Sequence, residues 1–574
     1  MGTCNPTACR ESGFVTIIGL MEKFFNNAGP QQPANNYTLD PLRRIRLDEL
    51  AGLIDQQRYF VLHAPRQTGK TTALYAMMHH YNAGTQYRAL YVNIEPAQAF
   101  REDVVHGIGT VCGALASAAS LHLKDDSLEL AYTAWKAAPD WGKMLTQCIK
   151  HLSAHDNAQP DNPRPLILMI DEIDALIGDT LISVLRQIRA GYADRPHAFP
   201  QSIILCGVRD VRDYRIHSSA SKEIITGGSA FNIKADSIRL GNFDQAEVGE
   251  LYQQHTDATG QVFTPEARAL AWSYTQGQPW LVNALAYDCT YRMKEMRDRS
   301  IPITGEIMRQ AKERMVLSRA THLDQLIDKL QEPRVRSIIG PLLEGQNLSD
   351  FPTDDLQYCI DLGLVSQGEE GNLKSITISN GIYREVIPRE LTYAAQVSFS
   401  NSQSHNAPQA WYLDDNGTPE KALNLPRLLA AFQQFYREHS EHWLSGMQYK
   451  EAGPQLLLQA YLQRIVNGGG RIEREYGLGR GRTDLYVTWP ACAEPRQREV
   501  IEIKVKRAKD SLDSLIAQGT EQTLEYMQRC KATQAHLMVF DTDADKSWDE
   551  KIYQRVVPAP QNQTQSPPIN LWGC

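Results

Sequence analysis

The sequence predicts a multidomain α/β protein, with a parallel sheet in its N-terminal half and a smaller α/β unit near its C-terminal end. A chain of 574 residues indicates three or four domains. Apolar runs typical of buried parallel strands alternate with helix-compatible segments. These runs lie at 59–62, 88–96, 165–171 and 201–208, and a second group of strands lies at 485–490 and 499–505.

Composition and charge exclude several classes of protein. The chain is 42% apolar and has a net charge of −8, so any contact with nucleic acid must come from local basic patches. Its ten cysteines form no C-x-x-C pair, which favours reduced thiols over disulfides or a zinc site. No apolar run approaches about 18 residues, so no membrane span is expected. Residues 1–20 lack signal-peptide features and Pro6 disfavours myristoylation, which predicts a cytoplasmic protein.

The segment 59–74, YFVLHAPRQTGKTTAL, places a turn between an apolar strand and a helix-compatible run. A phosphate-binding loop needs this setting, because successive backbone N–H groups and the positive end of the helix can cradle a triphosphate. Lys70 would reach the β- and γ-phosphates, and the Thr71 hydroxyl would ligate Mg²⁺. Ala64 replaces the usual first glycine, so the turn must tolerate a Cβ. The predicted ATP contacts are Ala64, Pro65, Arg66, Gln67, Thr68, Gly69, Lys70, Thr71 and Thr72.

An acidic pair follows the apolar strand in PLILMIDEIDAL, residues 165–176. Side chains at this position emerge at the carboxyl end of a parallel sheet, where nucleotide chemistry occurs. Asp171 is the candidate Mg²⁺ ligand and Glu172 the candidate base that deprotonates the attacking water. Asp174 fits either a supporting carboxylate or a charge at a helix N-terminus.

The strand at 201–208 ends in RDVRDYR, which offers polar groups that could sense the γ-phosphate. Arg209 and Asp210 are the candidates at the strand tip, while Arg212 and Arg215 could serve as a transition-state arginine from the same or a neighbouring subunit. A solvated basic loop is the alternative interpretation.

A last core strand is expected within 231–243, followed by a small helical domain over 243–330. Its Gly277-Gln278-Pro279-Trp280 turn opens a helix, with Pro279 at a favourable early position. This domain has the character of a lid that closes over the nucleotide base.

The order APRQTGKTT, LILMIDEID, IILCGVRDVRDYR and TQGQPWLVNALA resembles the bacterial AAA-like ATPases related to the STAND and initiator-type groups. The resemblance covers about residues 40–300 and implies a P-loop ATPase core over 36–242, after a lead-in over 1–35. It implies ATP and Mg²⁺ as cofactors, and it places Pro279 of the Gly-x-Pro turn near the nucleotide. Because such ATPases often form rings or dimers, a homo-oligomer is expected.

Residues 331–393 resemble a winged helix: two helices, the second ending in Gly-Leu-Val, then a β-wing and a closing helix. Such modules bind DNA in some proteins and act as spacers or autoinhibitory lids in others. The second helix carries Asp354, Asp355 and Asp361 and no basic residue, which favours a spacer or switch. Residues 394–445 are predicted to be a Ser/Asn/Gln-rich linker and an aromatic helix, whose His439 and His442 fit a surface helix better than a metal pair.

The C-terminal region 446–574 holds a second group of chemical residues. The midpoint between Asp484 and Glu502 falls in a Pro-containing turn, so an antiparallel hairpin would place the two carboxylates nearly opposite each other. Glu502 and Lys504 are two residues apart and share a face, while Ile501, Ile503 and Val505 point into the core. Two carboxylates and a lysine are the set that Mg²⁺-assisted phosphodiester hydrolysis needs.

Thr483-Asp484 and Glu502-Ile503-Lys504 resemble the motifs of the PD-(D/E)XK nuclease superfamily. That resemblance implies Glu451 as a further acidic metal ligand, and Gln522 with Tyr526 fit a Gln-x-x-x-Tyr pair. Alternating charges on an exposed strand could also produce the Glu-Ile-Lys pattern. The surrounding basic residues could grip a phosphate backbone or form a solvated rim. They are Arg471, Arg474, Arg480, Arg482, Lys506, Arg507 and Lys509.

The combined pattern resembles a bacterial family of AAA-like ATPases that carry a PD-(D/E)XK domain, suspected of roles in anti-phage defence or mobile-element biology. The sequence therefore predicts an ATPase that regulates a Mg²⁺-dependent nuclease, with nucleic acid, DNA by preference, bound at the C-terminal domain. Two alternatives stay open. The chain could be a STAND-type signalling switch with a non-cleaving nuclease-like domain, or a DNA-loading or transposition-associated ATPase that recognises DNA through its winged helix.

Overall fold

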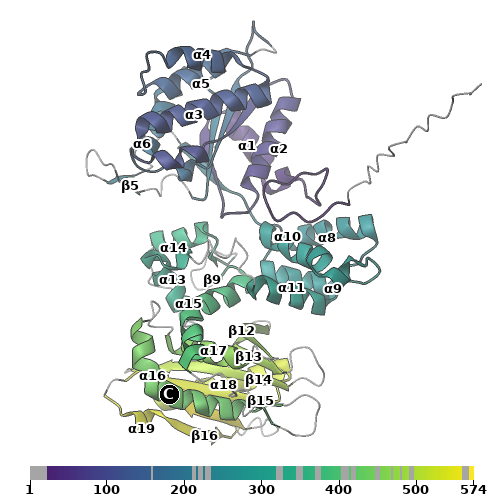
Figure 1. The fold of residues 1–574 in the computed structure, drawn as a ribbon, viewed down its shortest axis with the longest axis vertical. Coiled ribbons are helices and arrows are strands. Elements are labelled where there is room, and N and C mark those ends of the chain that lie inside the picture. Colours follow the sequence, from purple (N-terminus) through teal and green to yellow (C-terminus); the bar gives the residue numbers. More distant parts are fainter. Residues whose placement is uncertain are drawn as a thin grey trace, which may run out of the picture.

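The computed structural model shows three lobes: an N-terminal α/β lobe, a helical middle lobe and a C-terminal α/β lobe (Figure 1). The structure describes residues 22–156, 159–209, 215–217, 224–226, 234–317, 328–343, 353–368, 376–402, 413–414, 422–446, 453–466, 470–478, 481–489, 497–507, 509–543, 545–558 and 568–574.

The N-terminal lobe is built on a five-stranded sheet of order β2-β3-β4-β1-β7, in which all neighbouring strands are parallel. The predicted parallel sheet is thus confirmed. Its strands are β1 (Tyr59–His63), β2 (Arg88–Asn93), β3 (Leu166–Asp171), β4 (Ser202–Gly207) and β7 (Lys234–Arg239). A separate hairpin pairs β5 (Arg215–His217) with β6 (Ile224–Thr226).

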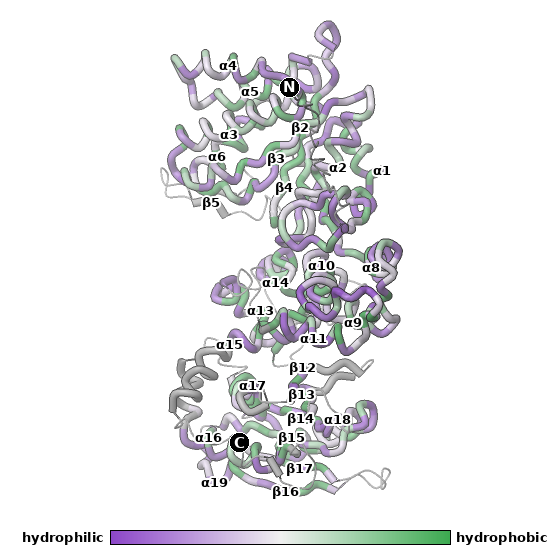
Figure 2. Tube along the Cα trace, turned by 45° about the vertical axis from the view of Figure 1, so that its right-hand side comes forward, coloured by the Kyte–Doolittle hydropathy of each residue, from purple (hydrophilic) through white to green (hydrophobic). Residues whose placement is uncertain are grey.

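Helices cover both faces of this sheet, which explains why β1, β3 and β4 are buried along their whole length. One face packs on α1 (Leu47–Asp55) and α2 (Lys70–Ala83). The other packs on α3 (Val104–Ala118), α4 (Ser127–Trp135), α5 (Met144–Ala154) and α6 (Gly178–Ala190). In Figure 2 hydrophobic residues run along the central strands. Short helical turns are η1 (Pro41–Arg44), η2 (Glu95–Phe100), η3 (Ala119–Leu123), η4 (Ile173–Ala175) and η5 (Tyr192–Asp194).

One described helical segment, Val104–Leu123, is long and apolar enough to cross a membrane by length and composition, with a mean hydropathy of 1.5. The expectation based on uninterrupted apolar runs missed it, because His106 and His122 lie within it. Its residues Ile108 and Leu115 are fully buried in the core of the N-terminal lobe. These residues pack the segment onto the sheet, and 39% of its apolar window is buried inside the protein.

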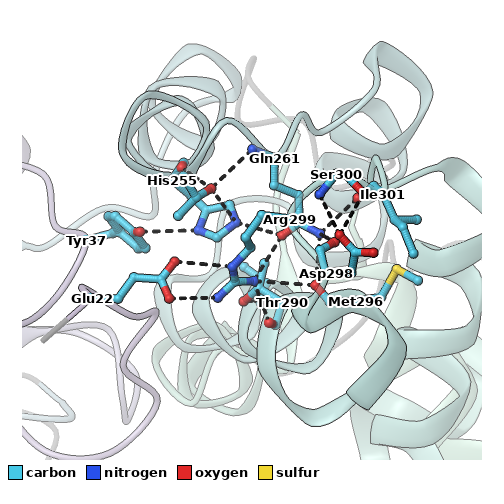
Figure 3. Close-up of polar contacts among 12 residues, drawn as sticks. Glu22, Tyr37, His255, Gln261, Thr290, Met296, Asp298, Arg299, Ser300 and Ile301 are labelled. Atoms are coloured by element: carbon cyan, nitrogen blue, oxygen red, sulfur yellow. Dashed lines mark hydrogen bonds and ion pairs between the residues drawn. The ribbon is translucent and has the colours of Figure 1, made fainter.

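The lid is a group of helices, and the N-terminal segment 22–41, here called the strap, packs into it. Phe25 and Tyr37 of the strap are buried in the hydrophobic core of the lid. Figure 3 shows the polar side of this contact: Glu22 pairs with Arg299 at 3.2 Å, and the Tyr37 hydroxyl lies 3.3 Å from His255 Nδ1. The lid contains α8 (Gln245–Thr259), α9 (Pro265–Thr275), α10 (Pro279–Tyr287), η7 (Asp288–Arg292), η8 (Lys294–Arg297) and α11 (Gly305–Leu317).

The rest of the middle lobe follows the element order predicted for residues 331–393, but its last helix ends at Ser402, so the prediction that a linker begins at residue 394 is wrong. Two helices precede a two-stranded antiparallel ribbon and a long helix, and they share one hydrophobic core with the lid. The elements are α13 (Pro333–Leu343), α14 (Thr353–Asp361), β8 (Val365–Ser366), β9 (Thr377–Ile378) and α15 (Gly381–Ser402). The assignment of this unit as a winged helix stays a prediction.

The C-terminal lobe is a mixed six-stranded sheet of order β12-β13-β14-β15-β17-β16. β12, β13 and β14 form an antiparallel meander, α18 crosses over, and β15 then pairs in parallel with β14. The strands are β12 (Arg471–Leu478), β13 (Gly481–Trp489), β14 (Gln497–Lys506), β15 (Gln534–Asp541), β16 (Tyr553–Val557) and β17 (Ile569–Gly573). A short pair, β10 (Leu413–Asp414) and β11 (Ala422–Leu423), precedes it.

Both faces of this sheet are covered, and Ile501 and Ile503 are buried in its core as predicted, with Val505 packed against it. Ile501 and Ile503 face α16 (Leu425–Gly446) and α17 (Gly453–Val466), whereas Val500 packs on the side of α18 (Leu512–Cys530). Since side chains alternate along a strand, Glu502 and Lys504 lie on the α18 side. The last helix is α19 (Trp548–Lys551).

Candidate functional site

The loop between β1 and α2 has the geometry of an anion cradle. Gly69 caps α2 in the left-handed conformation, with φ 88°, and Gln67 also has a positive φ of 58°. Ala64 is buried and its φ is not positive, so a Cβ is tolerated where the usual pattern has glycine. The Lys70 ammonium donates to the carbonyls of Ala64 and Pro65, at 3.0 and 3.1 Å. The loop thus holds its lysine beside the positive end of α2.

Asp171 lies directly beneath this loop and is fully buried. Its Oδ2 accepts hydrogen bonds from the Thr71 hydroxyl at 2.8 Å and from the Tyr91 hydroxyl at 3.1 Å. Its Oδ1 accepts from the backbone N–H of Glu172 at 3.0 Å. A hydroxyl and a carboxylate in direct contact are the oxygen donors that a Mg²⁺ ion between loop and strand would use, so Thr71 and Asp171 fit that ion.

Glu172 lines the same cavity and adopts a left-handed backbone conformation, with φ 61°. Burial raises the pKa of its carboxyl, and the charges of Asp174 and Asp171 raise it further, while Lys70 opposes them. A carboxyl with a raised pKa is a better proton acceptor for water than an ordinary one. Asp174 Oδ2 accepts from the backbone N–H of Val208 at 3.2 Å, so this side chain joins the ends of β3 and β4.

The cavity above the loop has a volume of about 610 Å³. Most of its lining comes from three parts of the chain, and Arg44, Tyr75, Tyr91, Asn93, Glu95 and Glu172 complete it. The loop contributes Arg66, Gln67 and Gly69 to Thr72, and the lid contributes Phe243, Leu251, Pro279, Trp280 and Asn283. Pro279 therefore lies where the resemblance implied. The strap supplies the third wall with residues 26–31 and 37–41. The indole N–H of Trp280 donates to the Asn27 carbonyl at 2.7 Å, which ties strap to lid.

Sequence reasoning missed the strap and Arg44 as parts of this site. Arg44 lines the cavity, donates to the Gly241 carbonyl at 3.0 Å and lies 4.9 Å from the centre of the Phe243 ring. Burial lowers the pKa of its guanidinium to about 10. The strap sequence has neither helical nor strand periodicity and is rich in Asn and Pro, so it is interpreted as an N-terminal segment outside the folded core. The one feature of the strap sequence that indicates local structure is Asp40-Pro41, which is typical of the start of a helix.

Arg209, the predicted phosphate sensor, is not among the residues that line the cavity. Its guanidinium lies 5.1 Å from the centre of the Tyr358 ring on α14. The turn after α14 reaches the phosphate loop: Gly363, with φ 74°, lies so close to Pro65 that a Cβ at 363 would approach its ring to 2.8 Å. Arg239 also donates to the Ile360 carbonyl at 3.0 Å. α14 is thus docked on the ATPase core beside its phosphate loop.

The other candidates at this strand tip cannot be placed. Asp210 and Arg212 lie outside the described residues, and so does the side chain of Arg215, although its backbone belongs to β5.

In the C-terminal lobe the structure brings Asp484, Glu502 and Lys504 together. The register of β13 and β14 pairs Leu485 with Ile501, so the next step along the ladder sets Asp484 against Glu502. Asp484 Oδ2 accepts from the backbone N–H of Ile503 at 2.7 Å. Lys504 Nζ lies 2.8 Å from Glu502 Oε1. The hairpin geometry expected from the midpoint of the two carboxylates is therefore present.

Glu502 is deeply buried within this cluster. It is only 4% exposed, and its Oε2 has no hydrogen-bond partner within the described part of the chain. Burial and the charge of Asp484 raise the pKa of Glu502 to about 8, against the opposing effect of Lys504. A buried carboxylate oxygen without a partner beside a second carboxylate fits a divalent cation.

The remaining nuclease candidates divide into those that the structure describes and those that it does not. Gln522 and Tyr526 lie on α18, where the Gln522 Oε1 is buried without a partner among the described residues. Glu451 lies outside the described residues, and so do Arg480 and the side chains of Arg474 and Arg482. His439 and His442 likewise have no described side chains. Within the described ranges no cluster of three or more His, Cys, Asp or Glu side chains is placed to hold a metal.

Two members of the predicted basic stripe are wrongly assigned. Lys506 is buried and bonds to Asp541 at 3.3 Å, and Arg471 pairs with Glu473 at 2.9 Å with its side chain only 15% exposed. Neither can grip a phosphate backbone in this arrangement. Arg507 and Lys509 are exposed as predicted.

The match to a protein family supports the interpretation of the N-terminal lobe as an ATPase. Residues 54–214 match the family model described as the AAA domain. None of the curated proteins matches the chain. Among solved structures, the Walker-type ATPase PABY2304 of Pyrococcus abyssi aligns with a TM-score of 0.40 and 14% identity, covering 63% of this chain and 99% of that one. The ORC2 protein of Aeropyrum pernix aligns with a TM-score of 0.37 and 14% identity over 62% and 93% of the chains. The Thermotoga maritima RuvB branch migration motor aligns with a TM-score of 0.29 and 10% identity over 61% and 95%.

Proposed function

Because residues 54–214 carry an AAA-type P-loop ATPase domain, we propose that this chain is an ATPase whose nucleotide state regulates a Mg²⁺-dependent nuclease in the C-terminal lobe. The observation that carries the nuclease half is the convergence of Asp484, Glu502 and Lys504 around a buried carboxylate oxygen without a partner among the described residues. A role in anti-phage defence or mobile-element biology, in the cytoplasm, is part of the same proposal and rests on resemblance.

In the ATPase half each residue has a separate task. The Lys70 ammonium moves from the loop carbonyls to the β- and γ-phosphates, and Glu172 orients and deprotonates the attacking water. Thr71 and Asp171 would hold Mg²⁺, which neutralises charge on the phosphates when bound. Arg209 can act as the sensor only if it leaves Tyr358, so nucleotide chemistry and the docking of α14 are linked.

In the nuclease half Asp484 and Glu502 would hold the cation. When bound, Mg²⁺ supplies a Lewis acid and lowers the pKa of a bound water. Two carboxylates are sufficient for this ion, because Mg²⁺ commonly completes its shell with waters and substrate phosphates. Lys504, held 2.8 Å from Glu502, positions the attacking water and offsets the charge that develops on the phosphate.

Buried charges connect the lid with the nuclease sheet and support a regulatory link. Lys312 of α11 forms an ion pair with Glu385 of α15 in the interior, and its ammonium lies 4.9 Å from the centre of the Tyr274 ring of α9. Burial lowers the pKa of Arg471 of β12, but the charges of Glu473 and Glu385 outweigh it and raise that pKa. Tyr274 directly precedes the Gly277 turn of the nucleotide cavity. A movement of the lid would therefore disturb charges at the edge of the nuclease sheet.

Of the two alternatives, the DNA-loading ATPase is disfavoured by the position of α14. This acidic helix is bonded to Arg239 through its Ile360 carbonyl, and the turn that follows it packs on Pro65 of the phosphate loop. The helix is therefore not free to enter a DNA groove. The signalling switch with a non-cleaving domain shares the same nucleotide chemistry. A cleavage assay separates it from the proposed function.

We expect the purified protein to cut DNA only when Mg²⁺ is present, with a rate that changes when ATP is added. The reason is that the two centres lie in different lobes and communicate through the lid. Supercoiled plasmid and single-stranded DNA are incubated with and without ATP and Mg²⁺, and an RNA of matched length tests the polymer. A protein that binds ATP yet leaves every polymer intact in Mg²⁺ would instead support the signalling switch.

The stabilisation of the protein by Mg²⁺ is expected to increase with pH. The pKa of Glu502 is about 8 against an ordinary value of 4.5, so the metal-free folded state holds a proton that the unfolded state loses. The retained proton stabilises the metal-free folded state against unfolding. This stabilisation is fully present below pH 4.5, the ordinary pKa of the group, and is lost as the pH rises through about 8. Mg²⁺ needs the carboxylate, so its shift of Tm should grow from about pH 6.5 to about pH 9.

Thermal unfolding with and without Mg²⁺ measures this effect. Glu502→Gln should remove the pH-dependent part of the shift. Glu499→Gln is the matched control, because Glu499 is buried on the same strand but on its other face, where it bonds to His536 at 2.8 Å. It should lower Tm and leave the Mg²⁺ shift in place. A Mg²⁺ shift that is the same at all pH values would contradict the assignment of Glu502 as a ligand.

A further inference from the structure

We infer that Asn283 is the residue that selects the adenine base, by accepting a hydrogen bond from its exocyclic amino group. This inference rests on the proposed nucleotide site and names a specificity determinant within it. Asn283 lies on α10, lines the nucleotide cavity and is only 5% exposed.

The orientation of the Asn283 amide is fixed by one contact. Its Nδ2 donates to the Pro279 carbonyl at 2.9 Å, and a carbonyl can only accept, so the nitrogen must point there. Its Oδ1 is therefore the free end, and it has no hydrogen-bond partner among the residues that the structure describes. A buried amide oxygen without a partner is unfavourable, so a ligand that donates to it gains affinity.

The position of the phosphates decides which part of the ligand can reach Asn283. Lys70 and Thr71 fix the phosphate end at the loop, whereas Asn283 lies on the lid beside Trp280 and opposite the strap. The ligand atoms on the lid side belong to the base. The Trp280 indole N–H is already bonded to Asn27, so it does not compete for the base. Adenine carries an amino group at the position where guanine, in the same pose, carries a carbonyl oxygen. That oxygen would face Asn283 Oδ1 as a second acceptor.

A second amide oxygen in the cavity provides an internal control. Gln31 Oε1 is also buried without a partner among the described residues, but the backbone N–H of Gln31 donates to the Thr72 hydroxyl at 3.2 Å. The Gln31 Nε2 donates to the Asn26 carbonyl at 3.0 Å, so this amide is held by the strap and not by the lid helix. Removing it should weaken all nucleotides alike, whatever base they carry.

The test compares the affinity of ATP with that of purine riboside triphosphate, which has hydrogen in place of the amino group. The wild-type protein should bind ATP about tenfold more tightly than this analogue, the effect of one buried hydrogen bond. In Asn283→Ala the ratio should fall to about one, and in Asn283→Asp, which keeps an acceptor, the preference should return. Gln31→Ala should keep the wild-type ratio. Because each ratio is measured on one variant, a general loss of affinity does not affect it.

Equal binding of ATP and the analogue by the wild-type protein would overturn the inference and leave the nucleotide site standing. An Asn283→Ala ratio as large as that of the wild type would overturn it too. A wild-type protein that binds neither triphosphate would overturn the proposed function itself, and the inference with it.

Discussion

Lys70→Ala is expected to reduce ATP hydrolysis by about 10²- to 10³-fold, the loss typical when one charged donor is removed from a transferring group. Lys70 is 7% exposed, and the Ala64 and Pro65 carbonyls hold its ammonium at the phosphate loop, so it reaches the phosphates without a large rearrangement. No other lysine lines the cavity within the described residues. Release of phosphate from ATP by the purified variant measures the effect.

Two further variants make this result specific. Lys143→Ala replaces an exposed lysine elsewhere in the N-terminal lobe and should leave turnover unchanged. Glu172→Gln removes the proposed base but not the phosphate contacts, so it should bind ATP with nearly wild-type affinity and hydrolyse it at least about 100-fold more slowly. Wild-type turnover in Lys70→Ala would mean that the loop does not hold the reacting phosphates.

Glu502→Gln should lower DNA cleavage by at least about 100-fold. Loss of a side chain that supports a metal ligand lowers metal affinity or activity by about 10- to 100-fold, and loss of the ligand itself should lower activity further. The substitution keeps the shape of the side chain but removes its negative charge. Glu502 has a buried Oε2 without a partner among the described residues, so no other described group satisfies that atom. Conversion of supercoiled plasmid into nicked or linear DNA in Mg²⁺ gives the rate.

Glu499→Gln serves again as the control for this substitution. It alters a buried carboxylate on the same strand that bonds to His536 and not to the proposed metal site. When the assay is run well below the Tm of this variant, so that its lower stability has no effect, it is expected to cleave DNA. Cleavage by Glu502→Gln at the rate of Glu499→Gln would exclude Glu502 as a metal ligand.

The parts of the fold and site that are predictable from sequence are those that depend on nearby residues. The phosphate loop needs only the strand–turn–helix at 59–74, and the acidic pair needs only its own strand. The Asp484–Glu502 pair is also predictable, because a hairpin folds about its midpoint and strand alternation fixes the facing side chains. In each case the chemistry follows from a short stretch with a fixed backbone geometry.

The parts that could not be predicted depend on distant partners. Arg209 lies at the strand tip as expected, but α14 arrives from about 150 residues away and covers it with Tyr358. Lys506 looks like an exposed cation until β15 brings Asp541 beside it. The strap has no periodicity, and its helix start at Asp40-Pro41 does not reveal that the segment closes the nucleotide cavity.

The most direct test of the two-centre account measures ATP hydrolysis and DNA cleavage in the same samples of wild type, Lys70→Ala and Glu502→Gln. The account predicts that Glu502→Gln hydrolyses ATP at the wild-type rate and does not cut DNA, while Lys70→Ala loses ATP hydrolysis. An equal loss of ATP hydrolysis in both variants would show that the two clusters do not form separate centres, and would contradict the account.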